Sequence, residues 1–295
     1  MGEIAALANA IIWAMTGVVT KGVGPNVRPT HIVSAQVWIG LLFLLTVGLI
    51  IGEIDALIHL NVRSAAFLAG GALVNTAGSL VFWLALSRGT VSRVYPTTQS
   101  VFIMTSVFAG WLFLGDDLEV GVLGGAVFII LGVVLLNWKP ARPDGESQSS
   151  GRGSSDLTAI GLGVTTSLLW TGGFLSTVIG LEDTPPVAAA TIRNLVPATL
   201  FVLVAFFFPS QRVTRVFKDN GIRLFASAIL FAVSALTFVL ALDQAPPSVV
   251  VVLINTSPMW AVVLATVLLR ERLNKYALAG AALSVAGIFV TLALR

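Results

Sequence analysis

The sequence predicts an all-α, polytopic membrane protein in which two inverted repeats of five transmembrane helices surround a central cavity. Three observations lead to this fold class. The chain of 295 residues is 56% hydrophobic and only 11% charged, against about 25% charged residues in soluble domains. Ten apolar runs are each long enough to cross a bilayer. Similar residues also recur at matching positions in the two halves of the chain.

The composition excludes several classes of protein. A chain with a mean hydropathy of +0.95 cannot build a water-facing surface, so lipid is expected to be its solvent. The absence of cysteine removes disulfides, thiol catalysis and Cys-ligated metal sites. The pI near 9.7 arises from scattered basic residues in short loops, which does not suit nucleic-acid binding. His31 and His59 have no clustered partners, so we expect neither a metal site nor a cofactor.

The ten predicted spans form two groups, because a transmembrane helix needs about 20 mainly apolar residues. In the first half the spans are 4–22, 32–52, 64–87, 91–114 and 118–138, and in the second half they are 157–179, 187–208, 221–242, 247–269 and 274–294. The first run is too long for the core of a signal peptide and has no basic start, so we expect it to be retained. The stretch between the groups, residues 139–156, is rich in Gly, Ser and Pro and is expected to be a flexible linker.

An internal duplication relates residues 1–138 to residues 157–295. Residues 157 positions apart correspond early in each half: Trp13 with Trp170, Pro29 with Pro186, and Gln36 with Arg193. Residues 155 positions apart correspond near the end of each half: Asp116 with Glu271, Gly125 with Gly280, and Gly132 with Gly287. Because five is an odd number of spans, the second half must enter the membrane from the opposite side. Such inverted repeats are common in secondary transporters.

The distribution of basic residues predicts the orientation in the membrane, since Lys and Arg favour cytoplasmic loops. Fourteen of the 17 basic residues lie in the loops that follow spans one, three, five, seven and nine. Only Arg63 and Arg295 lie in the other loops and the tails. This bias predicts that the linker 139–156 is cytoplasmic and that both termini are outside.

Arg193, in the stretch "AATIRNLVPATL", is the strongest candidate for a binding residue. It lies inside span seven, where a charge at mid-membrane costs roughly 2.5–3.5 kcal/mol on the insertion scale. The position suits a group that faces a water-filled cavity and contacts a carboxylate or phosphate of a substrate. An arginine that snorkels to the interface, or one satisfied by carbonyls of a broken helix, is the alternative. Its repeat mate Gln36 is neutral, so a site here would be asymmetric.

Other spans carry polar and aromatic residues at helical spacing. These stripes are Asn9, Trp13, Thr16 and Thr20 in span one, Thr166, Trp170, Gly173 and Thr177 in span six, and Asn75 and Ser79 in span three. Span eight has a weaker stripe of Ser234 and Phe238. A polar stripe with an aromatic residue suits the wall of a cavity. The alternative is that Ser and Thr bond across helices or back to their own turn.

Spans four and nine each contain a proline, which removes a backbone donor and loosens the helix. They read "RVYPTTQSVFIMTS", with Pro96, and "VVVLINTSPMW", with Pro258. Near the first proline, Tyr95, Thr98, Gln99 and Phe102 are placed to point donors and a ring into a central space, and Asn255 lies beside the second proline. Interrupted helices at matching depth indicate a binding region, or a kink that serves packing alone.

Spans five and ten are rich in small residues and are expected to form a structural seam, either between the halves or between protomers. The small residues are Gly121, Gly124, Gly125 and Gly132 in span five, and Ala277, Gly280, Ala281, Ser284 and Gly287 in span ten. No P-loop motif is present, which argues against an ATP-driven pump. No Asp or Glu lies near the centre of a span, so a carboxylate proton relay has no obvious carrier.

Taken together, these features resemble the EamA-domain family of the drug/metabolite transporter (DMT) superfamily. The likeness rests on the five-plus-five layout, the tryptophan stripe that opens each half, and the closing motifs "LGDDL" and "LRERL". It covers nearly the whole chain apart from the linker. The usual acid of the family's L-G-E-x-L motif is Asp116 once and Glu271 once. The family's proline ahead of that acid is Pro258 in span nine, whereas its place in span four is near Phe102, with Pro96 earlier.

The resemblance implies a basket of helices around a central cavity, with spans five and ten at the periphery. It also implies transport of small metabolites by alternating access, often the export of amino acids or related polar compounds. Four-span relatives bind cations and protons through a glutamate in the first helix. The matching place in this chain is near Trp13, so that chemistry is absent, and Arg193 favours anionic or zwitterionic substrates.

We therefore expect a secondary transporter that exports a small polar metabolite, an amino acid or an organic anion, across the plasma (inner) membrane of a prokaryote. The expected substrate-binding residues are Arg193, Trp13, Trp170, Asn9, Thr16, Gln36, Asn75, Ser79, Tyr95, Gln99 and Asn255. We expect a monomer or weak dimer in the lipid bilayer, with no nucleic-acid partner. An enzyme is not expected, because no cluster of His or Asp lies at an interface. A facilitative channel and a non-transporting scaffold or receptor remain the alternatives.

Overall fold

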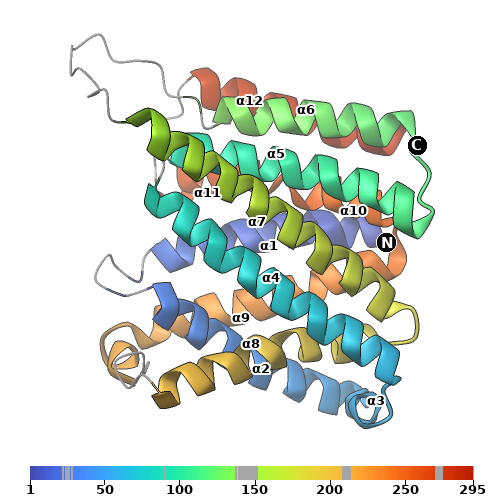
Figure 1. The fold of residues 1–295 in the computed structure, drawn as a ribbon, viewed down its shortest axis with the longest axis vertical. Helices are drawn as coiled ribbons and strands as arrows, with labels where there is room; N and C mark the ends of the chain where they lie inside the picture. Colours follow the sequence, from blue (N-terminus) through green and yellow to red (C-terminus); the bar gives the residue numbers. More distant parts are fainter. Residues whose placement is uncertain are drawn as a thin grey trace.

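The computed structural model consists of helices that follow the ten apolar runs (Figure 1). It describes residues 1–21, 23, 27, 29–88, 91–136, 138, 152–207, 214–269 and 275–294. In chain order the helices are α1 (Gly2–Lys21), α2 (Pro29–Ile51), α3 (Ile54–Ile58), α4 (Val62–Arg88), α5 (Val91–Ala109), the π-helical turn η1 (Gly110–Leu114), α6 (Val120–Leu136), α7 (Arg152–Leu181), α8 (Pro186–Phe207), α9 (Thr214–Gln244), α10 (Pro247–Ile254), α11 (Ser257–Leu269) and α12 (Lys275–Ala293). The described residues contain no strand, and the predicted all-α fold class is confirmed.

Length and composition agree with a protein that crosses the membrane many times. Nine of the described helices, counting α5 with η1 and α10 with α11 as one each, are long and apolar enough to span a bilayer. The tenth, α6, is apolar but has only 17 residues. The protein is an integral membrane protein.

Two spans are divided, both at positions where the sequence contains proline or glycine. Span nine is broken between α10 and α11, because Pro258 has no N–H to donate to the carbonyl of Ile254. Span four continues through Pro96 in α5 and then widens into η1. It ends at Gly115, whose φ of 74° lies in the left-handed region that glycine adopts without strain.

Two helices begin well before the predicted spans. Helix α7 begins at Arg152, so its first five residues belong to the stretch expected to be linker, and residues 139–151 lie outside the described part. Helix α9 begins at Thr214 rather than at 221 and is kinked at Asn220, where φ is −132° and ψ is 19°. The apolar run of span eight starts after this kink, so hydropathy alone could not reveal the extra turns.

Corresponding helices of the two halves run in opposite directions (Figure 1). Helix α1 starts beside the N-terminus at the right of the view and runs to the left, whereas α7 runs to the right; α6 and α12 are opposed in the same way. Both chain ends lie at the same end of the bundle. The second half is therefore inverted relative to the first.

The helix packing follows an approximate two-fold symmetry between the halves. Helix α1 packs along α9, and α7 packs along α4, so the first helix of each half lies on the third span of the other. In the same way α5 packs on α7, while α10 and α11 pack on α1. Helices α2 and α8 pack on each other, as do α6 and α12. The two halves thus build one core by exchanging partners.

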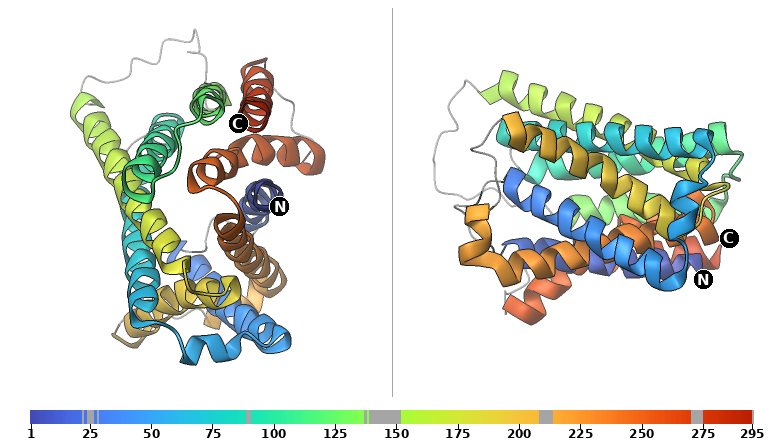
Figure 2. Two further views of the ribbon diagram at one scale, coloured as in Figure 1. Left: turned by 90° about the vertical axis from the view of Figure 1, so that its right-hand side faces the viewer. Right: turned by 90° about the horizontal axis from the view of Figure 1, so that it is seen from below.

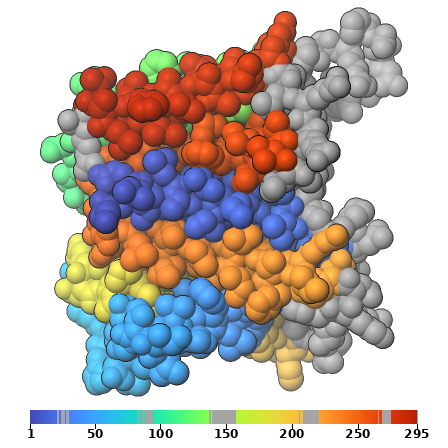
Figure 3. All heavy atoms as spheres, turned by 180° about the vertical axis from the view of Figure 1, so that it is seen from behind, coloured from blue at the N-terminus to red at the C-terminus, as the bar shows by residue number. Residues whose placement is uncertain are grey.

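This exchange leaves two walls that face each other (Figure 2). Seen along the helices, α4, α5 and α7 form one wall, and α1, α9, α10 and α11 form the other. Helices α2 and α8 close one edge, and α6 and α12 close the opposite edge. The space-filling view of Figure 3 shows the back of the second wall, where α1 lies between α9 on one side and α11 and α12 on the other.

The seam of small residues joins the two halves at α6 and α12. A Cβ on Gly132 would lie 2.7 Å from the carbonyl oxygen of Gly280, and one on Gly125 would lie 2.8 Å from that of Gly287. Distances this short leave no space for a side chain, so the glycines set the separation of the two helices. Of the two seams that the sequence allowed, the one between halves is present.

Candidate functional site

A cavity of about 260 Å³ lies between the two walls. Its lining residues are Asn9, Trp13, Asn75, Ser79, Gln99, Phe102, Trp170, Phe174, Arg193, Phe231, Ser234, Ala235, Phe238, Ile254, Asn255 and Ser257. Both halves of the chain contribute to this lining. Pockets for drug-sized ligands measure about 300–1,000 Å³, so this cavity fits a smaller solute.

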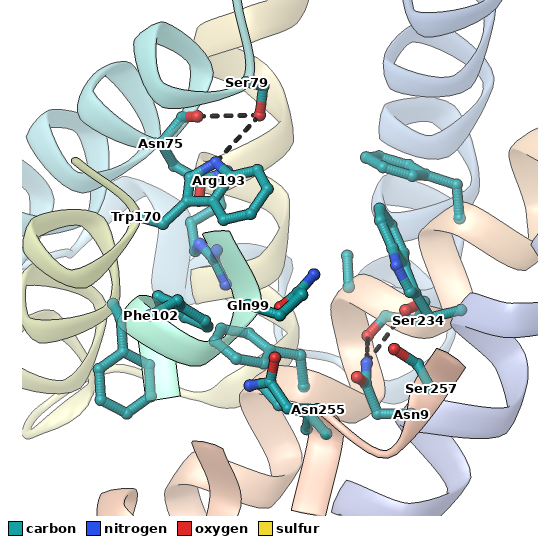
Figure 4. A pocket seen from close by; sticks show the side chains of 16 residues that line it. Asn9, Asn75, Ser79, Gln99, Phe102, Trp170, Arg193, Ser234, Asn255 and Ser257 are labelled. Atoms are coloured by element: carbon teal, nitrogen blue, oxygen red, sulfur yellow. Dashed lines mark hydrogen bonds between the residues drawn. The ribbon is translucent and has the colours of Figure 1, made fainter. Parts of the chain in front are cut away.

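Figure 4 shows how the polar residues are distributed around the cavity. Arg193, Trp170, Asn75 and Ser79 lie on one side. Asn9, Ser234 and Ser257 lie on the opposite side, and Gln99 and Asn255 lie between the two groups. A solute in the cavity would therefore meet a cationic end and an end of neutral hydrogen-bonding groups.

Arg193 is the charged residue of the lining. Its Nε is buried and has no hydrogen-bond partner among the described residues. The guanidinium lies over the ring of Phe238, with 4.7 Å between Cζ and the ring centroid. Such a cation–π contact is worth about 0.5–2 kcal/mol but leaves the charge in place. In the described part, no helix carbonyl accepts a hydrogen bond from Arg193 Nε, so this donor remains available to a ligand.

The start of α8 holds Arg193 at its depth in the membrane. The N–H of Val187 donates to Glu53 Oε2 across 3.2 Å, which satisfies one of the free donors at the helix N-terminus. Ala189 and Ala190 are fully buried beside this turn. Arg193 follows about two turns into the helix, because α8 begins at Pro186.

A continuous series of aromatic contacts lines the first wall and reaches the second. Phe82 packs against Trp170, Trp170 against Phe102, and Phe102 against Phe174, with ring centroids 5.3, 5.9 and 6.4 Å apart. Phe174 of α7 then meets Phe238 of α9, with 6.4 Å between centroids. These rings give the cavity an apolar wall that leads directly to the guanidinium of Arg193.

Trp170 is fixed by a glycine and a hydroxyl on α4. A Cβ on Gly78 would lie only 2.7 Å from Trp170 Cδ1, so the indole needs glycine at that place. The indole N–H donates to Ser79 Oγ at 3.4 Å, and Ser79 Oγ donates to the carbonyl of Asn75 at 3.0 Å. Trp13, its repeat mate, lies on the other wall with its ring 6.1 Å from that of Phe231.

The neutral end of the cavity is built by Asn9 and by the break in span nine. Asn9 Nδ2 donates to the carbonyl of Ser234 at 2.6 Å and to its Oγ at 3.0 Å, which joins α1 to α9. Asn255 Nδ2 donates to the carbonyl of Val251 at 2.7 Å, so its Oδ1 is left as an acceptor. Ser257, at the first turn of α11, is only 7% exposed and lines the cavity.

The cavity brings together most of the residues that the sequence analysis expected to bind substrate. Those that line it are Asn9, Trp13, Asn75, Ser79, Gln99, Trp170, Arg193 and Asn255. Thr16, Gln36 and Tyr95 are not part of this lining.

Each of these three residues has a local partner. Thr16 donates to the carbonyl of Ile12 in its own helix at 2.8 Å. Gln36 donates to Ser227 Oγ at 2.7 Å and to Thr20 Oγ1 at 3.3 Å, in a buried polar cluster that joins α1, α2 and α9. The ring of Tyr95 packs 6.0 Å from that of Phe82.

Sequence reasoning pointed to Phe102 and Phe238, which line the cavity, but missed Phe174, Phe231 and Ser257. Phe231 lies at helical spacing from Ser234 and Phe238 on α9, so this stripe is detectable in the sequence. Phe174 was obscured because its repeat mate is Gly17. Ser257 could be recognised as a lining residue only once the break in span nine was known.

The acid of the closing motif has a structural role. Asp116 Oδ2 accepts a hydrogen bond of 2.8 Å from the N–H of Ser248 at the start of α10, in the other half of the chain. Asp116 therefore caps the broken span nine and ties the halves together at that end. Its repeat mate, Glu271, lies outside the described residues.

Ten apolar spans in two inverted halves, with a partly polar cavity between them, define a helical membrane transporter. The profile of the EamA-like transporter family matches residues 1–138 and 157–293. The chain belongs to that family, and with it to the DMT superfamily that the sequence features resembled.

Two further comparisons agree with this assignment. The chain is 29% identical over 139 residues to the "Uncharacterized transporter YvbV" of Bacillus subtilis (strain 168), a stretch that covers 47% of this chain and 45% of that protein. The match thus spans about half the length of this curated relative. A solved structure titled "Crystal structure of protein" superposes with a TM-score of 0.80 over 99% of this chain and 96% of that chain. At 16% identity this likeness shows the fold alone.

Proposed function

We propose that this transporter is a secondary carrier that exports a small carboxylate-bearing metabolite, an amino acid or an organic anion. One observation carries the proposal: Arg193 faces a cavity of about 260 Å³ with no hydrogen-bond partner for its buried Nε in the described part of the chain. A carboxylate is the group that a guanidinium binds best, because two parallel N–H donors match its two oxygens. The aromatic series beside Arg193 would contact the apolar body of the solute.

Alternating access is supported by an asymmetry between the two ends of the cavity. Near their C-terminal ends α7 and α9 pack together, and Phe174 and Phe238 meet there. By the approximate two-fold symmetry α1 and α4 correspond to this pair, yet among the described residues they do not pack to a comparable extent. Phe174 and Phe238 would thus form the closed gate of this state, and the opposite end would be the more open one.

We place the carrier in the plasma (inner) membrane of a prokaryote, with residues 139–156 in the cytoplasm and both termini outside. Arg88 at the end of α4 and Lys275 at the start of α12 support this orientation, because those helix ends lie opposite the chain termini (Figure 1). With this orientation the more open end of the cavity faces the cytoplasm, which suits the loading of a solute for export. The carrier would act as a monomer or weak dimer.

The experiment tests whether the cavity recognises a carboxylate. Purified protein is screened by thermal shift against amino acids, organic acids and sugar phosphates, because a ligand that binds the folded state raises its melting temperature. Uptake into proteoliposomes then compares radiolabelled leucine and 2-oxoisocaproate, which carry a carboxylate, with leucinamide, which does not. We expect saturable flux of a carboxylate and none of leucinamide.

The Arg193→Gln variant keeps the size of the site but loses its charge. A hydrogen bond to a charged group is worth about 1.5–3 kcal/mol, so KM should rise by roughly ten- to a hundredfold. Arg88→Gln, which removes an exposed charge at the end of α4, is the matched control and should transport normally. Non-saturating flux would favour a channel, and binding without flux would favour a receptor. Unchanged transport by Arg193→Gln would remove Arg193 from the site.

A further inference from the structure

We infer that this protein is an exchanger of organic anions: because of Arg193, the cavity passes rapidly from one side of the membrane to the other only when an organic anion occupies it, so that the outward passage of one solute is tied to the inward passage of another. This inference rests on the proposed function and concerns the coupling of the same site. The sequence leaves open what drives the return of the empty carrier, and coupled exchange provides an answer.

The first step is the charge of the empty cavity. Among its lining residues Arg193 is the one with a formal charge, and the others are neutral amides, hydroxyls, aromatic rings, Ala235 and Ile254. None of the described residues in this lining is acidic. The empty cavity therefore carries one positive charge.

The second step is that two carboxylates at the ends of the bounding helices, Glu53 and Asp116, are already engaged. Glu53 accepts a hydrogen bond from the N–H of Val187 at the start of α8. Asp116 accepts one from the N–H of Ser248 at the start of α10. Both acids thus stabilise helix N-termini. Phe238 contacts the guanidinium of Arg193 through its ring, which attracts a cation without neutralising it.

The third step concerns the closed intermediate that alternating access requires. When the cavity is open at one end, water solvates Arg193. When both ends are closed and the site is empty, the charge is held between apolar walls with little water. If the closed, empty cavity cost as much as an arginine at mid-membrane on the insertion scale, this state would be populated roughly a hundredfold less than without that cost. Residual water and the ring of Phe238 reduce this factor, so we expect the empty carrier to cross at least about tenfold more slowly than the loaded one.

A bound organic anion removes this barrier, because its carboxylate neutralises the guanidinium inside the closed cavity, whereas a zwitterionic amino acid would leave the net charge unchanged. The loaded carrier then crosses readily in either direction, whereas the empty one does not. Net flux is limited by the return of the empty site, and exchange is not. Coupled exchange follows from one uncompensated charge and needs neither a proton-carrying acid nor a metal site, neither of which the sequence led us to expect.

Proteoliposomes that contain the full chain test this inference. Efflux of radiolabelled 2-oxoisocaproate, an organic anion, is measured into buffer alone and into buffer with the same unlabelled solute. We expect the external solute to accelerate efflux at least about tenfold. Equal rates in the two buffers would overturn the exchange mechanism and leave transport intact, whereas no efflux of 2-oxoisocaproate or of leucine under either condition would instead contradict the proposed function.

Two variants of Arg193 separate the role of its charge from a merely structural role. Arg193→Lys keeps the positive charge and should keep the acceleration by external solute. Arg193→Gln binds the solute more weakly, but its empty cavity is neutral and can return alone. Its ratio of exchange to net efflux should therefore fall towards one at saturating solute. A ratio in Arg193→Gln as large as in the original protein would contradict the inference, and the ratio of the original protein still tests it if the variant fails to fold.

Discussion

Replacement of Asp116 by alanine tests whether the closing motif caps span nine. Ser248 is 1% exposed, and its N–H lies 2.8 Å from Asp116 Oδ2. Helix α10 has no side-chain cap of its own, because its N-cap residue is Pro246. Asp116→Ala would leave a buried N–H without its acceptor at the positive end of a helix.

The magnitude follows from these contacts. Loss of a helix cap costs about 0.5–2 kcal/mol, and loss of a hydrogen bond to a charged group costs about 1.5–3 kcal/mol. We expect a loss of about 2 kcal/mol in the free energy of unfolding. For a chain of this size that corresponds to a fall of about 4–8 °C in the melting temperature. Asp116→Asn keeps an acceptor oxygen without the charge, so it should lose about half as much.

The measurement is thermal unfolding of the purified protein in detergent. Asp117→Ala is the matched control, because Asp117 is the exposed neighbour of Asp116 in the same motif. The melting temperature of Asp117→Ala should equal that of the original protein. If Asp116→Ala and Asp117→Ala melt together, the carboxylate of Asp116 does not stabilise α10 and the assigned role is wrong.

Three other substitutions test the packing that shapes the cavity. Gly78→Ala should displace Trp170, because the new Cβ would lie 2.7 Å from Trp170 Cδ1, and solute affinity should therefore fall several-fold. The control is Gly70→Ala on the same helix, whose new Cβ would have no atom within 4 Å; this variant should bind solute normally. Gly125→Val should force α6 from α12 and lower the melting temperature by more than Asp116→Ala does, which thermal unfolding would show. Asn9→Ala removes the hydrogen bonds of 2.6 and 3.0 Å to Ser234 and should lower the free energy of unfolding by about 1–3 kcal/mol. At roughly 2–4 °C per kcal/mol this loss should be visible in thermal unfolding, and a melting temperature within 1 °C of the original would argue against the link between Asn9 and Ser234.

The sequence predicted the fold well, because lipid imposes strong demands on it. Every span must be long and apolar, so hydropathy locates the helices. The similar offsets, 157 positions from Trp13 to Trp170 and 155 from Gly125 to Gly280, reveal the duplication, and an odd number of spans then requires inversion. The additional turns of α7 and α9 were missed because they are polar and lie outside the apolar runs.

The cavity was predicted less completely, because sequence spacing shows which residues share a face but not what that face contacts. Asn9 and Gln36 are both polar residues in apolar helices. Asn9 lines the cavity while it bonds to Ser234, whereas Gln36 is enclosed by Thr20 and Ser227 at another level of the bundle. Only the packing of α1 and α2 against α9 separates these two cases.

The aromatic wall was predicted only in part, for a different reason. Phenylalanine is the expected residue on any lipid-facing or core position of a membrane helix, so Phe174, unlike Phe102 in the proline-containing span, carries no signal in a sequence that has 17 phenylalanines. The role of Phe102 and Phe174 depends on ring contacts between α5, α7 and α9, which link residues more than 60 positions apart. Polar residues, being costly in lipid, are the ones that a sequence makes visible.

The central claim is that a water-accessible cavity lies inside the membrane between the two halves, and it can be tested with thiol labelling because the chain has no cysteine of its own. Ala235→Cys places a thiol on the cavity wall, and Leu42→Cys places one on a lipid-exposed face of α2. In proteoliposomes a charged, water-soluble maleimide should label Ala235→Cys and not Leu42→Cys, and a transported carboxylate should slow that labelling. An unreactive thiol at position 235, or equal reactivity at positions 235 and 42, would contradict the account.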